Sequence, residues 1–415
     1  MDNYKKVKLS EVAEINIRQI NKNSIFDNII YIDIASVTKG TIDETQNIQT
    51  SKAPSRAKRL VKKNDILYST VRPNLEHYTF IKDDLPNNTV ASTGFAVITP
   101  NQDLVDPYYL YCLITQSQFT QYLSQVAEQA VSTYPTVSPN VIADLELSLP
   151  PLSEQKRISN ILSSFDNKIE QLKKENNILE NIAQTIFKEW FVNYNFPNKD
   201  GKPYKDSGGK MIDSELGLIP EGWRVGKLGE VLELKSGYPF SSKDYAEKSS
   251  QQIIRISDVK GKGIIDSNKA FYISNNAIQD SRAKDFILSQ GDILISMSGS
   301  IGRIGIVPKI IHNTLYLNQR VGKLFFKKPL FRNYLHSLLL SNNLEEKISS
   351  MGYGSVQQNI NSKQIHEIPF VIPSTDSLQN FNEKFTALIN KHTSNYEETG
   401  QLALMKELLL NKLLK

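Results

Sequence analysis

The sequence predicts a mixed α/β protein with a pseudo-two-fold internal repeat, in which two globular domains are separated by two long helices that form an antiparallel coiled coil. Three observations lead to this prediction. Segments of the first half recur in the second half, each half ends in a heptad pattern of helical length, and short β-branched stretches precede each heptad. At 415 residues the chain is also too long for one ordinary core.

Three pairs of segments carry the repeat, and their spacing varies only between 219 and 227 residues. A duplicated unit of about 200 residues is too long for a solenoid repeat. We therefore expect two copies of one domain. The pairs are YKKVKLSEV (4–12) with WRVGKLGEV (223–231), PSRAKRLVKKNDILYSTVRPN (54–74) with DSRAKDFILSQGDILISMSGS (280–300), and YPTVSPNV (134–141) with YGSVQQNI (353–360).

Each copy is expected to begin with a mixed domain, at residues 1–150 and 223–373. Stretches such as NIIYIDIASV and QIIRISDV have strand character, and apolar stretches of helical length lie between turn-forming residues. A linker loop at 193–222 separates the copies.

A long helix should follow each domain, at 151–192 and 374–415. Two prolines end the strand before the first helix, and Ser153 is placed to cap it. In the second helix Asp376 and Gln379 match a capping box.

Both helices carry a seam of positions spaced alternately four and three residues apart, which is typical of a coiled coil. The first seam has one polar residue, Asn176, and the second is polar in its centre, so antiparallel pairing places Asn176 close to Asn395 and Thr399. Asn176 either fixes the register or is a tolerated polar residue. The predicted seam comprises Ile158, Leu162, Phe165, Ile169, Leu172, Asn176, Leu179 and Ile186 with Phe385, Leu388, Thr399, Leu402 and Leu409.

Apolar residues also lie away from the seam, including Ile161, Ile178, Ile182 and Phe187. A two-helix coil buries one stripe only, so this second stripe predicts helices of another protein that complete a bundle. For Ile161, near the helix end, a contact with the adjoining domain is the alternative.

Charged residues are distributed unevenly along the chain, and this limits the kinds of partner that it can bind. Residues 1–150 hold 14 Lys and Arg against 16 Asp and Glu, a net charge of −2, whereas residues 216–372 hold 20 against 13, a net charge of +7. Six basic and no acidic residues occupy 52–63, a run that fits a solvated face or a nucleic-acid footprint.

Cys112 is the sole cysteine, which excludes an internal disulfide, and no apolar run reaches the ~18 residues of a membrane span. Without a signal sequence, we expect a cytoplasmic protein.

Enzyme motifs are incomplete. DPYY at 106–109 is similar to a methyltransferase motif but lacks its second proline, and GSIGRIG at 299–305 does not have the spacing of a phosphate loop. EQK at 154–156 falls in a first helical turn, where residues two apart do not share a face. The five histidines lack metal-ligand spacing. We therefore expect a protein that is not an enzyme and holds no metal or cofactor.

Two similar domains on a stiff antiparallel spacer match the symmetry of duplex DNA, whose half-sites lie roughly one helical turn, ~34 Å, apart. Because the copies have diverged, their half-sites should differ, which predicts an asymmetric bipartite target. Linking two weak readers also raises affinity through effective concentration.

Several segments resemble type I restriction–modification specificity subunits, and together they cover nearly the whole chain. PPLSEQKRI, LSSFDNKIE and IFKEWFVNYNFP resemble the family's central repeat, and SELGLIPEGWRVGKLGEV resembles the start of its second target-recognition domain. APSRAKRLVKKNDILYSTVRPNL with ASTGFAVITP resembles one type of recognition domain, and GDILISMSGSIGRIG another. The polar centre of the last helix is a departure from this pattern.

The resemblance implies a non-catalytic subunit that binds double-stranded DNA and two modification subunits, which methylate an adenine in each half-site. Two ATP-driven restriction subunits, which cut unmodified DNA, are an optional addition. S-adenosylmethionine, ATP and Mg would belong to these partner subunits and not to this chain.

The candidate DNA-binding residues lie in polar segments of both copies. Arg can bond guanine through two donors, Asn and Gln suit adenine, and Lys mainly meets phosphate. Since SRAK occurs in both diverged copies, we expect it to contact phosphate or support the fold. The loops at 131–138 and 353–359 differ between copies and are better candidates for specificity, with an ordinary capped loop as the alternative. The candidates are Arg56, Lys58, Arg59, Arg72, Asn74, Tyr134 and Thr136, and in the second copy Arg282, Lys284, Arg303, Gln319, Arg320, Gln357 and Gln358.

Two rival interpretations remain open. A fused methyltransferase–nuclease would need several hundred more residues with cofactor and metal motifs. A scaffold that joins other proteins would lack salt-dependent binding to duplex DNA.

Overall fold

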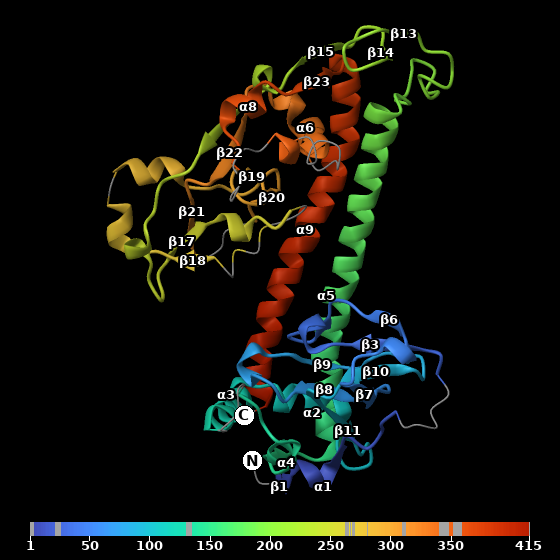
Figure 1. The fold of residues 1–415 in the computed structure, drawn as a ribbon, viewed down its shortest axis with the longest axis vertical. Coiled ribbons are helices and arrows are strands. Elements are labelled where there is room, and N and C mark those ends of the chain that lie inside the picture. The colour runs from blue at the N-terminus through green and yellow to red at the C-terminus, as the bar shows by residue number, and fades with distance from the viewer. Residues whose placement is uncertain are drawn as a thin grey trace. The chain divides into compact units, whose positions relative to one another are not determined.

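The computed structural model describes residues 4–20, 26–129, 135–261, 265, 267, 270–279, 281–308, 313–339, 348–351 and 359–414. The chain forms two compact units. The first comprises residues 1–171 and 399–415, and the second comprises residues 172–398. Each unit combines one mixed α/β domain with part of both long helices (Figure 1).

Two four-stranded sheets form the body of the first unit. Strands β8 and β11 are buried on both faces, because alternate residues enter different core clusters: Ile66 and Tyr68 pack toward the helices, and Leu67 packs toward the second sheet. The second sheet contains one parallel pair, β3 with β10. In spatial order the strands are β2 (Ala13–Ile15), β11 (Phe95–Pro100), β8 (Ile66–Ser69) and β9 (Tyr78–Phe80), then β6 (Gln46–Gln49), β3 (Asn28–Ile32), β10 (Thr89–Ser92) and β7 (Ala57–Leu60).

Short helices, among them α1 (Leu9–Val12), a hairpin of β4 (Val37–Thr38) with β5 (Thr41–Ile42), and a two-stranded ribbon complete the described part of the first domain. The helices supply Leu110, Leu113 and Leu123 to the cluster that contains Ile66. The ribbon joins the first strand of the domain to the last, and the last strand leads through two prolines into the first long helix. These elements are α2 (Pro107–Ile114), α3 (Ser117–Gln129), α4 (Pro139–Ala143), β1 (Lys5–Lys8) and β12 (Glu146–Leu149).

The second unit has the same central sheet, with equivalent strands in the same spatial order. A second sheet again contains one parallel pair, β17 with β21, and a ribbon of β15 with β23 again closes the domain. The elements are β16 (Leu232–Ser236), β22 (Val321–Phe326), β19 (Ile293–Ser296) and β20 (Ile304–Ile306), then β18 (Phe271–Tyr272), β17 (Gln251–Ile254) and β21 (Thr314–Leu317), with β15 (Arg224–Lys227), β23 (Pro369–Ile372), α6 (Arg332–Leu339) and α8 (Ser362–His366). The predicted mixed α/β repeat is confirmed.

The repeat extends to individual hydrogen bonds. Leu9 N donates to Leu145 O at 2.9 Å in the first unit, and Leu228 N donates to Ile368 O at 3.0 Å in the second. In both copies a Glu three residues after a Lys accepts from the amide of that Lys. Residues that looked merely similar in sequence therefore make the same structural contacts.

One predicted correspondence is wrong by four residues. Val137 N donates to Thr70 O at 2.8 Å, and Ile360 N donates to Met297 O at 3.0 Å, so the equivalent positions are 137 and 360. The pairing of 134–141 with 353–360 would have matched residue 141 to residue 360. Backbone hydrogen bonds to a segment distant in sequence fix the register of this loop. The sequence of a short polar loop has no periodic pattern from which that register could be predicted.

The long helices are α5 (Leu152–Phe187), which continues as a π-helical turn at Lys188–Val192, and α9 (Thr375–Leu413). The predicted caps are wrong. Ser153 lies inside the first turn of α5, where the carbonyl of Pro151 receives the amides of residues 154 and 155. At the start of α9 the Ser374 hydroxyl accepts from Ser377 N at 3.3 Å, in place of a capping box formed by Asp376 and Gln379.

The two long helices pair in antiparallel directions, as predicted. In the first unit Lys406 lies 2.6 Å from Asp166. In the second unit Lys391 lies 3.4 Å from Glu175, and the rings of Phe381 and Trp190 have centroids 5.9 Å apart. Residue numbers thus fall along α9 as they rise along α5.

Every predicted seam residue is at least partly buried. In the centre, Asn176 Nδ2 donates to the backbone oxygen of His392 at 3.3 Å, and the His392 ring lies 2.9 Å from Glu180. Asn395, one helical turn further along α9, is fully buried. Ile158, Leu162, Leu172 and Phe385 are buried, whereas Phe165, Ile169, Asn176, Leu179, Ile186, Leu388, Thr399, Leu402 and Leu409 are partly buried.

The second apolar stripe is only partly exposed. Ile178 and Ile182 are exposed, and Ile161 is partly buried. Phe187 does not belong to an accessible stripe: it is buried in the core of the second unit, with its ring 5.8 Å from that of Tyr334. Phe187 is buried because it contacts the adjoining domain, and the heptad pattern of the helix gives no information about that contact.

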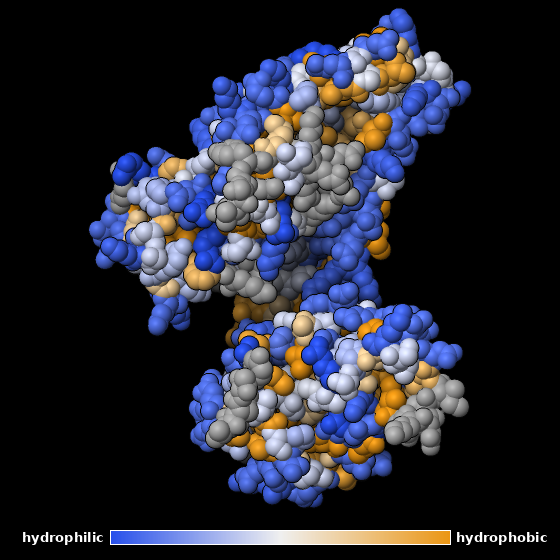
Figure 2. Space-filling model, in the orientation of Figure 1, coloured by the Kyte–Doolittle hydropathy of each residue, from blue (hydrophilic) through white to orange (hydrophobic). Residues whose placement is uncertain are grey.

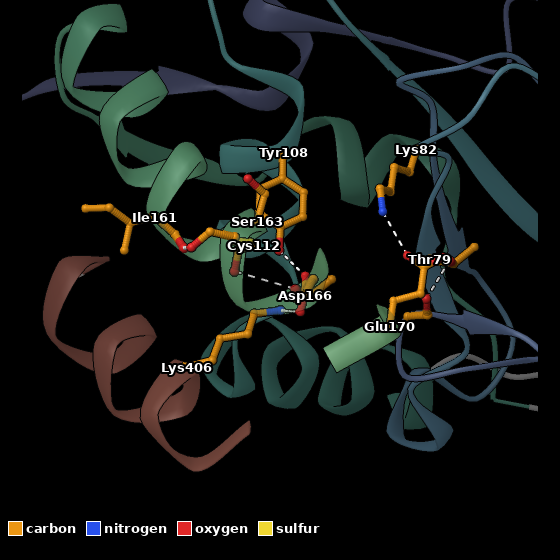
Figure 3. Close-up of polar contacts among 12 residues, drawn as sticks. Thr79, Lys82, Tyr108, Cys112, Ile161, Ser163, Asp166, Glu170 and Lys406 are labelled. Carbon is orange, nitrogen blue, oxygen red and sulfur yellow. Dashed lines mark hydrogen bonds and ion pairs between the residues drawn. The ribbon is translucent and has the colours of Figure 1, made fainter. Parts of the chain in front are cut away.

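A partly buried polar cluster ties α2 to both long helices in the first unit (Figure 3). The Asp166 carboxylate accepts from the hydroxyl of Tyr108 and from Lys406 Nζ. Beside them, burial raises the pKa of the Cys112 thiol to about 12, so this thiol stays protonated. The charge of Lys406 is therefore compensated inside the unit.

We expect Asp166→Ala to lower the free energy of unfolding by about 1–3 kcal/mol, because Lys406 and Tyr108 would lose their common acceptor. Urea unfolding of the full chain measures this change. Asp84→Ala is the matched control, since its pair with Lys63 is exposed and should contribute less than about 1 kcal/mol. Equal losses in the two variants would contradict the role given to Asp166.

The stability of the second unit should depend on pH through His336 of α6, which is buried against Phe385 of α9. Burial, assisted by the charge of Arg332, lowers its pKa to about 4. Between about pH 6.5 and about pH 4 the unfolded chain binds a proton that the folded chain does not, so stability is lost as the pH falls.

From about pH 7.5 to about pH 5 this group should remove about 2 kcal/mol of the free energy of unfolding. His336→Gln should abolish that share of the loss. Urea unfolding of both proteins at both pH values tests it, and an unchanged pH dependence in the variant would refute the assignment.

Candidate nucleic-acid interface

The SRAK segment of the first copy turns its arginine toward the fold. Arg56 Nε donates to the Tyr31 hydroxyl at 3.0 Å, and Nη2 lies 2.6 Å from Asp33. These two partners raise the pKa of Arg56. Lys58 is exposed, whereas Arg59 is partly buried, its pKa is lowered by burial, and its Nε has no hydrogen-bond partner among the described residues. Arg56 therefore supports the domain, and Lys58 stays accessible.

The second SRAK adopts a different local structure, a 3₁₀ helix at Ser281–Phe286. Arg282 and Lys284 are exposed there. What the two copies share is a buried alanine, Ala57 in one and Ala283 in the other. This observation supports a structural reason for the recurrence of the SRAK sequence.

Two candidate segments of the first unit are joined by backbone hydrogen bonds. Arg72 N donates to Pro135 O at 2.9 Å, and Val137 N donates to Thr70 O at 2.8 Å. The turn after β8 and the loop before α4 therefore lie against each other, although about 60 residues separate them in the sequence.

These segments present several predicted contacts together. Arg72 is exposed and has φ of +46°, a left-handed conformation that costs a non-glycine residue energy and is enriched at functional sites. Asn74 follows in an exposed 3₁₀ turn, and Thr136 lies partly buried beside them. Tyr134 lies outside the described residues.

A third segment joins this cluster, and it belongs to the ASTGFAVITP stretch, none of whose residues is among the predicted DNA contacts. The carbonyl oxygen of Gly94 accepts from both the amide and the hydroxyl of Thr70, at 2.8 and 2.9 Å. Thr93 N donates to Arg56 O at 2.7 Å, and the Thr93 side chain is exposed. A Cβ atom on Gly94 would come within 2.2 Å of Ile34 Cδ1, so a larger residue here would require the Ile34 side chain to move. We call residues 70–74, 92–94 and 135–137 the first rim.

The second unit contains an equivalent cluster. Met297 N donates to Arg320 O at 3.1 Å and Met297 O accepts from Ile360 N at 3.0 Å. Ser298 forms an isolated bridge with Asn359. We call residues 297–303, 318–320 and 359–360 the second rim.

The second rim carries three of the predicted DNA contacts. Arg303, Gln319 and Arg320 are all exposed. The GSIGRIG motif is the tight turn between β19 and β20, with Gly299 and Gly302 in left-handed conformations. Gln357 and Gln358 lie outside the described residues.

The other motifs have structural roles. The Asp106 side chain accepts from Tyr109 N at 2.9 Å and caps α2. Gln155 is buried, accepts from Asp106 N and donates to Pro150 O, so it joins the starts of two helices. Within the described part of the chain, no group of three His, Cys, Asp or Glu side chains could hold a metal ion.

On the face drawn in Figure 2, the coloured residues are mainly hydrophilic, with apolar residues in separate smaller patches. Over the described ranges, none of the helices is both long and apolar enough to span a membrane. The apolar side chains exposed on α9, Leu404, Met405 and Leu408, lie outside both rims.

Comparison with known proteins gives consistent matches along the chain. A family model described as "Type I restriction modification DNA specificity domain" matches residues 1–181 and 220–402. The chain is 25% identical to the specificity subunit of type I restriction enzyme HindI from Haemophilus influenzae, over 100% of this chain and 99% of that one. It is 28% identical to the MjaIX specificity subunit from Methanocaldococcus jannaschii, over 89% of this chain and 81% of that one.

The fold is similar to a crystal structure of the type I restriction–modification S subunit from M. genitalium. The TM-score is 0.54 at 16% sequence identity, covering 100% of this chain and 96% of that chain.

Arg56→Ala should lower the free energy of unfolding by about 1 kcal/mol, because Tyr31 and Asp33 would lose a shared donor. Thermal and urea unfolding of the full chain would detect this. Lys63→Ala, in the same basic run but paired only with exposed Asp84, is the control and should change stability less. The structural role of Arg56 would be wrong if both substitutions had the same effect.

Proposed function

Since the chain belongs to the type I restriction modification DNA specificity family and is a specificity subunit, we propose that each of its two domains reads one half of an asymmetric, gapped DNA sequence. The observation that carries this proposal is the duplication. The family model matches both halves, and both halves build the same sheet and the same rim.

The divergence of the two copies supports unequal half-sites. The scaffold of each domain is retained down to single backbone bonds, whereas exposed rim residues differ, such as Thr93 in the first and Gln319 in the second. We assign recognition to residues 1–150 and 223–373, with 193–222 as a linker and with 151–192 and 374–415 as spacer helices.

Positive charge near the rims suits contact with the DNA backbone. Lys58, Arg282 and Lys284 are exposed and would serve phosphate, where loss of one contact weakens binding to all sequences alike. Gln319 and Asn74 each pair a hydrogen-bond donor with an acceptor, which suits adenine, and Arg320 offers two donors, which suit guanine, in the major groove.

The long helices would hold the catalytic partners. Ile178 and Ile182 on α5 and Leu404, Met405 and Leu408 on α9 are exposed although apolar. Helices of two modification subunits would cover these side chains, and two restriction subunits would join the assembly in hosts that have them.

We assign the catalytic activities to the modification and restriction subunits. The modification subunits would supply S-adenosylmethionine and methylate adenine, and the restriction subunits would supply ATP- and Mg-dependent cleavage. This chain would act in the cytoplasm as the non-catalytic subunit that selects the sequence.

A methylation map of host DNA tests the proposal. Cells should express the chain together with its neighbouring modification subunit, and the control cells should express the modification subunit alone. We expect methyladenine at a gapped motif only when the chain is present, because base selection resides in its two domains.

No new methylated motif, with both proteins made and purified together, would contradict DNA recognition. Salt-independent association with duplex DNA would point the same way, since contacts to phosphates release counterions and weaken as salt rises. The chain would then be a protein scaffold.

A further inference from the structure

We propose that Thr93 and Gln319 occupy one specificity-determining position, which reads a base in the first half-site through Thr93 and in the second through Gln319. This inference rests on the proposed function, and it adds to that function a residue, Thr93, that is not among the DNA contacts predicted from the sequence.

The equivalence of the two positions follows from strand register. In the first unit Phe95 of β11 pairs with Ser69 of β8, and in the second Val321 of β22 pairs with Ser296 of β19. Thr93 and Gln319 each lie two residues before those paired positions.

In both copies the carbonyl oxygen of the next residue accepts from the amide that follows the equivalent central strand, β8 or β19, whereas different segments hold the amide at this position. Gly94 O accepts from Thr70 N at 2.8 Å, and Arg320 O accepts from Met297 N at 3.1 Å. The amide of the preceding residue is also fixed in both, by Arg56 O in the first unit and by Tyr238 O in the second. A fixed backbone orients the side chain that it carries and lowers the entropy lost on binding.

The side chains differ although the backbone does not. One copy has Thr-Gly and the other has Gln-Arg, and both Thr93 and Gln319 are exposed. Diverged copies that keep the fold need no such change for stability. A change confined to exposed side chains on a common scaffold is what two readers of different bases require.

Neighbouring residues form the rest of a reading surface. Thr136 bridges to Val71, next to Arg72, in the first rim, and Asn359 bridges to Ser298 in the second. A glutamine amide can bond adenine bidentately. A threonine hydroxyl can donate or accept a hydrogen bond, and its methyl group can contact the methyl group of thymine. The ligand is therefore the base edge of duplex DNA in a groove.

The test is methylation of a DNA library by the full chain with its modification subunits and S-adenosylmethionine. The library varies, one at a time, each base of the gapped motif that the unsubstituted complex methylates. Thr93→Gln should change the preference by roughly 10-fold at one base of one half-site and leave the other half-site unchanged. Gln319→Glu should act on the other half-site alone, shifting it from adenine toward cytosine because the carboxylate only accepts hydrogen bonds.

Thr93→Ser and Thr93→Val identify the reading group. If the hydroxyl reads the base, the Ser variant keeps the parental preference, and if the methyl group reads it, the Val variant does. Thr38→Ala and Gln279→Ala are the matched controls, since both residues are exposed and lie outside the rims. Both should methylate with the parental preference.

The inference is overturned if both conservative variants keep the parental preference and Thr93→Gln does too. It is also overturned if the Thr93 and Gln319 variants lose activity evenly over all library sequences, which indicates a phosphate contact or a structural role. Failure of the proposed function looks different, because then the parental complex itself shows no gapped motif.

Discussion

Pairing between the first and last strands of each domain is the constraint on which the rest of the molecule depends. In the first unit Lys5 lies opposite Leu149, and in the second Arg224 lies opposite Ile372. The last strand of each ribbon passes directly into a long helix. Because the ribbon is held by backbone bonds, each domain is fixed to the start of its helix, and the rims keep a defined place within their own unit.

Much of the fold was predictable because it repeats or is periodic. The duplicated segments and the heptad spacing indicated two domains and two antiparallel helices, which the structure confirms. Features that depend on distant partners were not predictable. Phe187 is buried by Tyr334, far from it in sequence. The caps were placed wrongly for a local reason, because α5 begins after Pro151 and α9 after Ser374, one or two residues before the predicted caps.

The candidate interface was predictable in part for the same reason. Composition indicated Arg72, Gln319 and Arg320, since charged and amide side chains in turns are recognisable in sequence. Thr93 was not recognisable, because an exposed threonine next to a buried strand is ordinary until strand register places it opposite its counterpart. The Arg56 side chain is the converse case, since its guanidinium, although exposed, bonds Tyr31 and Asp33 of its own domain.

The first unit takes part of its core from residues 399–415, which are translated after the whole second domain. Leu414 is buried in the same cluster as Ile158 and Leu162, and Lys406 reaches Asp166. A nascent chain on the ribosome therefore cannot finish its first domain until more than two hundred further residues have emerged. A product cut short by a premature stop codon would keep its first rim but would expose the apolar side chains of the first core that Leu414 and its neighbours cover.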